Sequence, residues 1–180
     1  MTRAFVALDL PPETEDAIQG LQQALTAYRP TPADNLHLTL VFLDDQPDDV
    51  LEDLHDRLAA LRPPAISLTL GGGDLMGRGG QVLALRTQNT PEMTALQAEV
   101  ARAARKSGIH PEARRFLPHV TIARPRAPDA PAALAKLTAA LPPEVRLAPA
   151  TAPSFSLFGS VLHPTGARHE ALATYPLPLA

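Results

Sequence analysis

Two short stretches of the sequence combine residue types that can carry out acid–base chemistry. His37 and Thr39 are separated by one residue, and His119 and Thr121 repeat the same spacing. Histidine is the only side chain whose ordinary pKa, about 6.5, allows one copy to be neutral and another protonated near neutral pH. A neutral imidazole takes up a proton and a protonated one releases it. The two histidines can therefore supply the general base and the general acid of one reaction.

The residues around each His-x-Thr predict β-strands. Apolar side chains alternate with the His and Thr: Leu38, Leu40 and Phe42 in the first stretch, and Val120 and Ile122 in the second. Alternate residues of a strand point to opposite faces, so each His shares a face with its Thr while the apolar residues face a core. Burying imidazoles and hydroxyls without partners costs roughly 1–3 kcal/mol per group. We therefore expect a polar ligand between the two motifs.

A phosphodiester suits that position. Opening a cyclic phosphate requires a base that takes a proton from the attacking water and an acid that protonates the departing ribose oxygen. The hydroxyls of Thr39 and Thr121 can donate to the non-bridging oxygens of the phosphate. This chemistry needs no metal ion, and we expect neither a metal site nor a cofactor.

The other histidines do not lie in a repeated His-x-Thr strand motif. His55 lies within a predicted amphipathic helix, and His110 and His163 lie in proline-flanked loops. We expect these three to be ordinary solvated side chains. His169, in a C-terminal strand, stays ambiguous.

Strands and helices alternate around the motifs. Strands are predicted at 5–8, 36–43, 66–70, 82–85, 119–123, 154–162 and 168–174. Helices are predicted from Pro12 to Tyr28, from Pro47 to Leu61, from Thr90 to Gly108 and from Asp129 to Leu141, on apolar residues at helical spacing and on helix-starting Pro, Thr and acidic residues. The glycines at 71–73 are expected to end a strand.

The order of these elements repeats once. Strand 5–8, a helix and the His37 strand are echoed by strand 82–85, a helix and the His119 strand. The first strands are 77 residues apart (5 to 82) and the histidines 82 apart (37 to 119), a drift that loop lengths explain. The pattern predicts two α+β lobes related by a pseudo-twofold axis. We expect residues 1–180 to form one domain made of these two similar lobes.

The composition is that of a globular protein without disulfides. The 180 residues include no cysteine, which excludes disulfides and thiolate metal sites. The first residues form too short an apolar run for a signal peptide or a membrane span. We expect a cytoplasmic, monomeric protein that does not bind membranes.

Charge is unevenly distributed along the chain. Residues 1–60 hold twelve acidic residues and three arginines (−9), residues 61–126 hold ten basic and four acidic residues (+6), and the rest balances, so that the total is −3. A protein that coats long nucleic acid usually carries a basic surface overall, whereas a single phosphate needs only a local positive field. The distribution favours the second case, although surface charges often segregate without a functional reason.

The two motifs, in their sequence context, resemble a known family. The segments DNLHLTLVFL (34–43) and RFLPHVTIAR (115–124) look like the paired signatures of the 2H phosphoesterase superfamily, and most resemble its bacterial and archaeal branch of 2′-5′ RNA ligases and RNA 2′,3′-cyclic phosphodiesterases. The resemblance starts at RAFVALDLP (3–11) and returns at Ser160 and GARHE (166–170). It therefore spans nearly the whole chain.

The resemblance implies a bilobed α+β fold in which antiparallel sheets line a central cleft and helices lie outside. It implies that His37 is the general acid and His119 the general base, with RNA ends or small cyclic nucleotides as substrates and an RNA 2′-phosphate as product. Arg124, five residues after His119, matches a family arginine expected near the phosphate, a role that suits a bidentate guanidinium. We expect Arg115 to add positive potential at the mouth of the cleft.

Three positions depart from the family pattern. Asp44 stands where the family often has Gly, and His169 where Tyr is common. Near Ala84 the family often has an aromatic residue that could contact a base. Only 4% of the chain is aromatic and it has no Trp, so base stacking should be weak.

The sequence leaves other functions to be weighed. The same residues could run the reaction in reverse and join a 2′,3′-cyclic phosphate to a 5′-hydroxyl. A non-catalytic nucleotide or RNA-end binding module is a second alternative, although both histidines are present. A metallohydrolase is disfavoured because neither motif contains an acidic residue. An ATP-driven ligase is disfavoured because no phosphate-binding loop or nucleotidyl-transfer lysine motif is found.

Overall fold

The chain is an α+β protein with antiparallel strands, as predicted. The computed structural model describes residues 1–26, 28–76, 82–113, 115–125, 141, 144–163 and 166–179. The helices are α1 (Pro12–Gln22), α2 (Asp48–Ala59) and α3 (Pro91–Lys106), and a 3₁₀ turn, η1, spans Ala33–Asn35. The strands are β1 (Thr2–Leu8), β2 (Tyr28–Pro30), β3 (Leu38–Gln46), β4 (Ser67–Leu68), β5 (Leu70–Met76), β6 (Val82–Thr87), β7 (His119–Pro125), β8 (Ala150–Thr151), β9 (Ser154–His163) and β10 (Gly166–Pro176).

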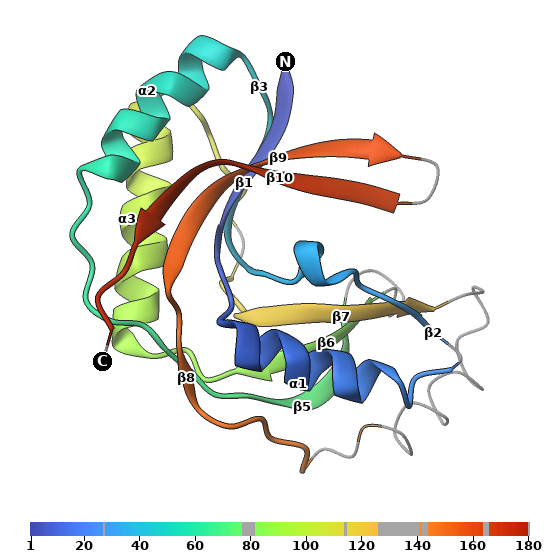
Figure 1. The fold of residues 1–180 in the computed structure, drawn as a ribbon. Helices are drawn as coiled ribbons and strands as arrows, with labels where there is room; N and C mark the ends of the chain where they lie inside the picture. The colour runs from blue at the N-terminus through green and yellow to red at the C-terminus, as the bar shows by residue number, and fades with distance from the viewer. Residues whose placement is uncertain are drawn as a thin grey trace.

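One large sheet joins the two His-x-Thr segments (Figure 1). Its strand order is β10-β9-β1-β3-β7-β6-β5, and β4 and β8 form a separate pair. In the middle, β3 meets β7 at the pair Leu38–Val120. Farther along β7, residues 123–125 pair with β2 in place of β3. The two motif strands are therefore neighbours at one point and separate beyond it.

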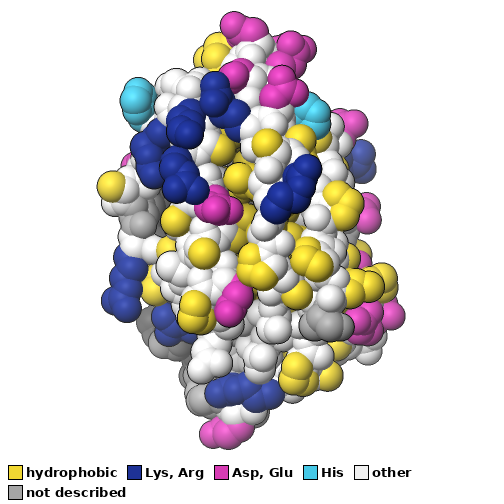
Figure 2. Space-filling model, turned by 90° about the vertical axis from the view of Figure 1, so that its left-hand side faces the viewer, with side chains coloured by type: hydrophobic (Ala, Val, Ile, Leu, Met, Phe, Trp, Pro, Cys, Tyr) yellow, Lys and Arg dark blue, Asp and Glu magenta, His cyan; other side chains and the backbone are white. Residues whose placement is uncertain are grey.

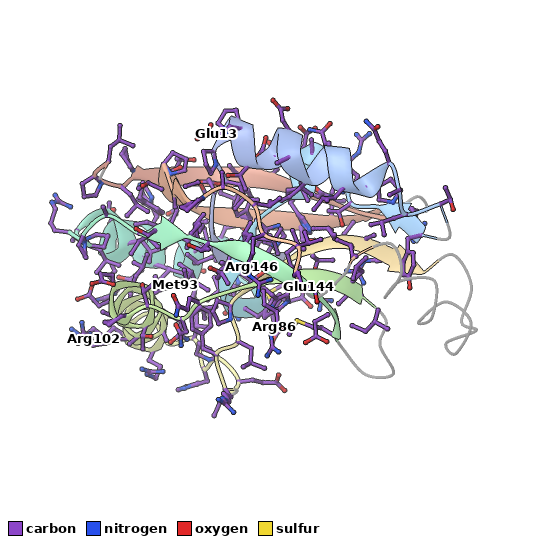
Figure 3. All side chains as sticks on the ribbon, turned by 90° about the horizontal axis from the view of Figure 1, so that it is seen from below. Glu13, Arg86, Met93, Arg102, Glu144 and Arg146 are labelled. Carbon is purple, nitrogen blue, oxygen red and sulfur yellow. The ribbon has the colours of Figure 1, made fainter. Side chains whose placement is uncertain are left out.

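The helices cover the core face of the sheet. Helix α3 contacts α2 and β3, α2 also contacts β10, and α1 contacts β7. Leu54 of α2 and Met93 of α3 are fully buried in the same core as Leu38 and Val120. Met93 and Arg102 lie on opposite sides of α3 (Figure 3). The face of the sheet that carries His37 and His119 is thus opposite to the helices.

Local sequence explains how the helices begin. The Thr90 hydroxyl accepts a hydrogen bond from the N–H of Met93 (3.2 Å), which caps α3. Helix α2 opens after Pro47 with Asp48 and Asp49 in its first turn, where carboxylates are favoured by the helix dipole. No helix in the described parts of the chain is long and apolar enough to cross a membrane.

The charge segregation seen along the sequence is also visible on the helix side. Figure 2 shows that Lys and Arg side chains gather on one flank of this face and Asp and Glu side chains at its upper end. Because the helices lie opposite the histidines, clustered charge on this protein does not by itself mark the phosphate site.

The first helix is shorter than predicted. It ends at Gln22, and Leu25 and Tyr28 lie beyond it, although both are buried. Tyr28 instead begins β2, which was not predicted. The Gln22 amide donates to the carbonyls of Thr31 (2.9 Å) and Ile122 (2.8 Å), so the end of the helix is tied to β7 and the chain turns there. Leu25 and Tyr28 are therefore apolar because they are buried, and not because the helix continues through them.

The glycine run does not end a strand, which corrects the prediction. β5 continues through it, with a register shift between Gly71 and Gly73 and a left-handed φ of 61° at Gly72. A Cβ on Gly71 would lie 2.4 Å from the side chain of Arg146. Glycine therefore permits both the bulge and the close approach. The fourth helix, predicted at 129–141, falls outside the described residues except for Leu141.

A bulge in β3 overturns the predicted position of Phe42. Ala7 pairs with Thr39 while Val6 pairs with Val41, so Leu40 is an extra residue and the alternation of faces reverses after it. Phe42 is 59% exposed on the same face as Thr39, not in the core beside Leu38.

A second irregularity follows in β3 at Asp44. This residue has a left-handed φ of 57°. The left-handed region is costly for residues with a Cβ, although Asp tolerates it better than most. This gives a physical reason for the glycine that the resembling family often has there.

Candidate active site

The two His-x-Thr segments meet on one face of the sheet. His37 immediately precedes β3 and His119 is the first residue of β7. Residues paired across an antiparallel ladder share a face, and Leu38–Val120 is such a pair on the core face. Counting one residue outward in each direction places His37 opposite Thr121, and Thr39 opposite His119. We call this face, defined by these four half-buried residues, the histidine face.

A bulge in β7 brings Arg124 to the histidine face. Thr121 pairs with Ala84 and Ala123 pairs with Leu83, so Ile122 is an extra residue. Without it, a residue five positions after His119 would point to the core. Arg124 is exposed, and its charge is close enough to lower the pKa of His169 on β10. All five predicted site residues thus share one face, while their roles stay predictions.

The same backbone contact orients both imidazoles. Nδ1 of His37 lies 2.8 Å from the carbonyl oxygen of Asn35, and Nδ1 of His119 lies 2.7 Å from that of Leu117. A carbonyl oxygen can only accept, so Nδ1–H donates in each ring and Nε2 carries the lone pair when the ring is neutral. Each motif therefore presents Nε2 as the nitrogen available for proton transfer.

His37 lies among aromatic rings. Its ring centroid is 4.7 Å from Phe5, 6.0 Å from Phe158 and 5.2 Å from His169. Burial, followed by positive charge on His169 and on His119, lowers the pKa of His37 to about 4, although the hydrogen bond to Asn35 acts in the opposite direction. In the free protein His37 is therefore neutral at neutral pH.

His169 and Asn35 complete the surroundings of His37. The Asn35 amide donates to the carbonyl of Ala167 (2.7 Å), and the backbone N–H of His169 donates to the Asn35 side-chain oxygen (3.2 Å). This clamp holds β10 against the turn before His37. The ring of His169 stands edge-on to His37 and Phe5. Burial, and then the charge of Arg124, lower the pKa of His169.

Sequence patterns do not assign either residue to the site. His169 lies outside both His-x-Thr motifs, and Asn35 precedes the first of them by two residues. The contacts join positions 132 and 134 residues apart, so no local pattern could have found them. The Nδ1 atom of His169 is buried and has no hydrogen-bond partner among the described residues.

Three of the five phenylalanines gather on the histidine face. Phe5 lies 5.1 Å from Phe158 in a stacked arrangement and 6.4 Å from Phe42. Phe5 is buried, so Phe42 is the ring of this cluster with the most exposed surface. Weak base stacking stays a prediction, and Phe42 is the side chain on which to test it.

The other histidines lie outside this arrangement. His55 of α2 forms a hydrogen bond with the Tyr175 hydroxyl (2.9 Å), so this exposed side chain is not merely solvated. His110 is exposed, as predicted, and the side chain of His163 lies outside the described residues. Within the described ranges, no three His, Cys, Asp or Glu side chains converge in a way that could hold a metal ion.

The chain is similar to known proteins over most of its length. Residues 10–150 match the sequence profile of the 2′-5′ RNA ligase superfamily. The RNA 2′,3′-cyclic phosphodiesterase of Escherichia coli K12 is 33% identical over 126 residues, covering 68% of this chain and 71% of its own. The enzyme of the same name from Thermus thermophilus is 33% identical over 139 residues, covering 70% of each chain.

Solved structures share the fold. The apo crystal structure of E. coli LigT superimposes with a TM-score of 0.79 at 27% identity, covering 98% of this chain and 97% of that one. The same protein in complex with 3′-AMP superimposes with a TM-score of 0.74 at 27% identity and equal coverage. The profile covers most of the sequence and the relatives cover two thirds or more of it. The chain belongs to the 2′-5′ RNA ligase superfamily.

Proposed function

We propose that the protein is a metal-independent phosphodiesterase that opens RNA 2′,3′-cyclic phosphate ends to 2′-phosphates. The observation that carries the proposal is the matched presentation of two imidazoles on one face, each with Nδ1–H anchored on a backbone carbonyl and Nε2 left for proton transfer. Relatives at 33% identity bear the name RNA 2′,3′-cyclic phosphodiesterase. The family membership and the geometry thus support the same chemistry.

The proposed reaction needs only these side chains and water. One Nε2 removes a proton from water as the water oxygen bonds to phosphorus. The bond from phosphorus to the ribose 3′ oxygen breaks, and the second imidazolium gives its proton to that oxygen. The products are a 2′-phosphate and a 3′-hydroxyl. The hydroxyls of Thr39 and Thr121 donate to the non-bridging oxygens, and Arg124 stabilises their charge.

We assign His37 as the general acid and His119 as the general base. His37 is neutral in the free protein because its pKa is lowered to about 4. An anionic phosphate beside the ring favours the protonated form. Substrate binding must therefore raise the pKa of His37 before the ring can act as an acid, and an NMR titration with and without a bound 2′-phosphate product measures this rise.

A substrate with an activated leaving group tests the assignment. Such a leaving group departs without much protonation, so it should restore turnover in His37→Ala but not in His119→Ala. The opposite pattern of rescue would exchange the two roles.

We also propose that residues 1–180 form one domain of two similar lobes around a central cleft. β1, α1 and β3 repeat as β6, α3 and β7, and both motif strands carry a bulge at the residue after their Thr. The two repeats meet at Leu38–Val120. These correspondences support a duplication in which each half supplies one imidazole to the cleft.

The reverse reaction is the second candidate. The matching family is named for 2′-5′ RNA ligase, and the same acid and base would join a cyclic phosphate to a 5′-hydroxyl. In water the hydrolytic direction should dominate unless both RNA ends are held together.

The direct test is incubation of purified protein, in EDTA, with a short RNA ending in a 2′,3′-cyclic phosphate, followed by identification of the product terminus. A 2′-phosphate formed in EDTA supports the proposal. Loss of activity in EDTA with recovery on addition of a divalent ion would contradict the metal-free mechanism.

A further inference from the structure

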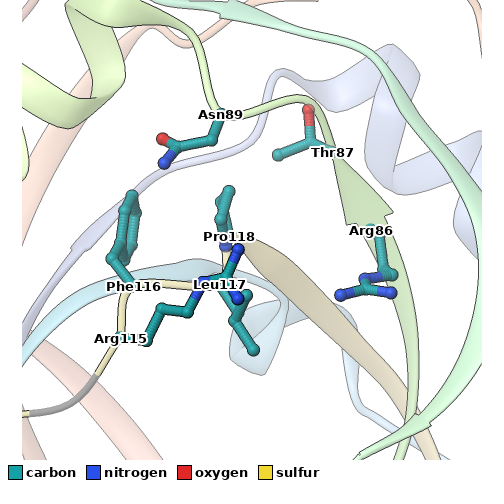
Figure 4. A pocket seen from close by; sticks show the side chains of 7 residues that line it. All are labelled: Arg86, Thr87, Asn89, Arg115, Phe116, Leu117 and Pro118. Carbon is teal, nitrogen blue, oxygen red and sulfur yellow. The ribbon is translucent and has the colours of Figure 1, made fainter.

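A cavity opens beside the His119 motif and is not used by the chemistry described above. Its volume is about 240 Å³, and it lies between the end of β6 with the loop that follows it and the segment 115–118 that leads into β7. Arg86 and Arg115 turn their guanidinium groups into it from two sides (Figure 4). We call it the arginine pocket.

The lining of the arginine pocket suits an anion. Besides the two arginines, Thr87 and Asn89 contribute polar groups, and none of the described residues that line it is acidic. The Asn89 side-chain oxygen already accepts from the Thr94 hydroxyl (2.9 Å), so its NH₂ group is the part free to donate. Arg86 makes one ion pair with Asp74 (3.1 Å). With both side chains about half exposed, that pair is weak, and the remaining guanidinium donors stay available.

The pocket is rigidly connected to the proposed base. Arg86 pairs with His119 across β6 and β7, so both side chains project from the histidine face. Pro118, which precedes His119, lines the pocket, and its carbonyl accepts from the N–H of Thr87 (3.2 Å). A group held in the pocket therefore keeps a fixed position relative to a phosphate held at His119.

Its size excludes a large ligand. Sites that enclose a drug-sized molecule usually measure about 300–1,000 Å³. A smaller cavity with two guanidinium groups fits one phosphate-sized group, which arginine binds through paired N–H donors.

We propose that the arginine pocket binds the phosphodiester that precedes the cyclic end of the substrate RNA. A 2′,3′-cyclic phosphate occupies both the 2′ and 3′ oxygens of the last ribose. The rest of the RNA must therefore continue from the 5′ oxygen, whose phosphate is the nearest second anion. The inference rests on the proposed function and adds a substrate preference: RNA ends over cyclic mononucleotides.

The test compares two substrates that share the same terminal nucleotide, a 2′,3′-cyclic mononucleotide and the dinucleotide ending in it. The wild-type protein should turn over the dinucleotide with a kcat/KM at least about tenfold higher, and Arg115→Gln and Arg86→Gln should each reduce this ratio several-fold, since each removes a charge-assisted contact to phosphate. The comparison uses the ratio of the two kcat/KM values. An effect of either variant on His119 that slows both substrates equally therefore cancels.

Arg57→Gln is the matched control. Arg57 is partly exposed and paired with Asp53 (2.8 Å), much as Arg86 is with Asp74, but it lies on α2 on the helix side. It should leave both rates and their ratio unchanged.

A wild-type ratio near one, or a ratio unaffected by both pocket variants, would overturn the proposal. A ratio unaffected by both pocket variants is also expected if the pocket binds a second RNA strand instead, because the dinucleotide contains no second strand.

Calorimetric binding of the dinucleotide 3′-phosphate and the mononucleotide 3′-phosphate separates the two proposals without turnover. The protein could bind the dinucleotide 3′-phosphate more tightly, in a way that depends on the two arginines, yet hydrolyse neither cyclic substrate. That result would support the pocket proposal and contradict the proposed phosphodiesterase activity. Hydrolysis of both substrates at equal rates, with equal binding of both 3′-phosphates, would support the phosphodiesterase and contradict the pocket.

Discussion

The two His-x-Thr segments share their backbone geometry but not their surroundings. Both rings are anchored through Nδ1–H on the carbonyl two residues earlier. The ring of His37, however, lies within about 6 Å of the rings of Phe5, Phe158 and His169. His119 instead has Arg86 opposite it and directly follows a residue that lines the arginine pocket. Acid–base catalysis needs one neutral and one protonated imidazole. The unequal environments keep His37 neutral in the free protein, so that its role as the acid depends on a bound phosphate raising its pKa.

The largest expected effect comes from removing either imidazole. We expect His37→Ala and His119→Ala each to lower kcat on an RNA 2′,3′-cyclic phosphate by about 10²–10⁴-fold, because each removes a general acid or base. Circular dichroism should show intact folds. His110→Ala, which removes an exposed histidine, is the control and should retain full activity. A near-wild-type rate in either motif variant would show that the pair does not act as acid and base.

The low pKa of His37 predicts a loss of stability in acid. Its pKa is about 4 in the folded protein and about 6.5 when unfolded, so between these values the unfolded chain binds the extra proton. The free energy of unfolding should therefore fall as the pH drops from 6.5 to 4, by up to about 3 kcal/mol from this group. Urea unfolding at pH 7 and pH 4.5 measures the fall, and His37→Gln should reduce it. Identical pH dependence in both proteins would mean that His37 is not held neutral by burial.

Loss of a threonine hydroxyl should cost less than loss of a histidine. Thr39→Ala and Thr121→Ala each remove one hydrogen bond to a charged phosphate, worth about 1.5–3 kcal/mol, and should reduce kcat/KM by roughly 10–100-fold. Thr39→Ser and Thr121→Ser keep the hydroxyl and should recover most of the rate. A threonine variant that is slower than both histidine variants would show that the roles are misassigned.

The smallest expected effect concerns the neighbour of His37. His169→Phe removes a positive charge that lowers the pKa of His37 but keeps an apolar ring beside it. The pKa of His37, measured by NMR titration, should rise but stay below 6.5, because burial is the larger cause. If the pKa of His37 falls or does not change, His169 does not contribute to the lowered pKa of His37.

Local patterns were enough to predict much of the site. Alternation around His37 and His119 placed each His with its Thr on one face, and Thr90 was correctly identified as the start of α3. These features depend on neighbouring residues only.

Features that depend on the partner strand could not be predicted in this way. The bulges at Leu40 and Ile122 are defined by the register against β1 and β6, and they decide which face Phe42 and Arg124 occupy. The clamp between Asn35 and β10 joins distant positions. The unpredicted strand β2 exists because β7 offers it a free edge beyond Leu38–Val120.

The pH dependence of kcat for an RNA 2′,3′-cyclic phosphate, measured with saturating substrate in EDTA from pH 4 to 9, tests the central claim most directly. This rate reports the substrate-bound protein, in which the phosphate has raised the pKa of His37. Two histidines acting as acid and base predict a bell around neutrality whose limbs are the macroscopic pKa values of the coupled pair. On the acid limb of the bell the general base is protonated, so the rate should fall. A site that merely binds phosphate through imidazolium charges would keep those charges in acid. A rate that still climbs from pH 7 down to pH 5 would contradict His119 as a general base, and with it the proposed mechanism.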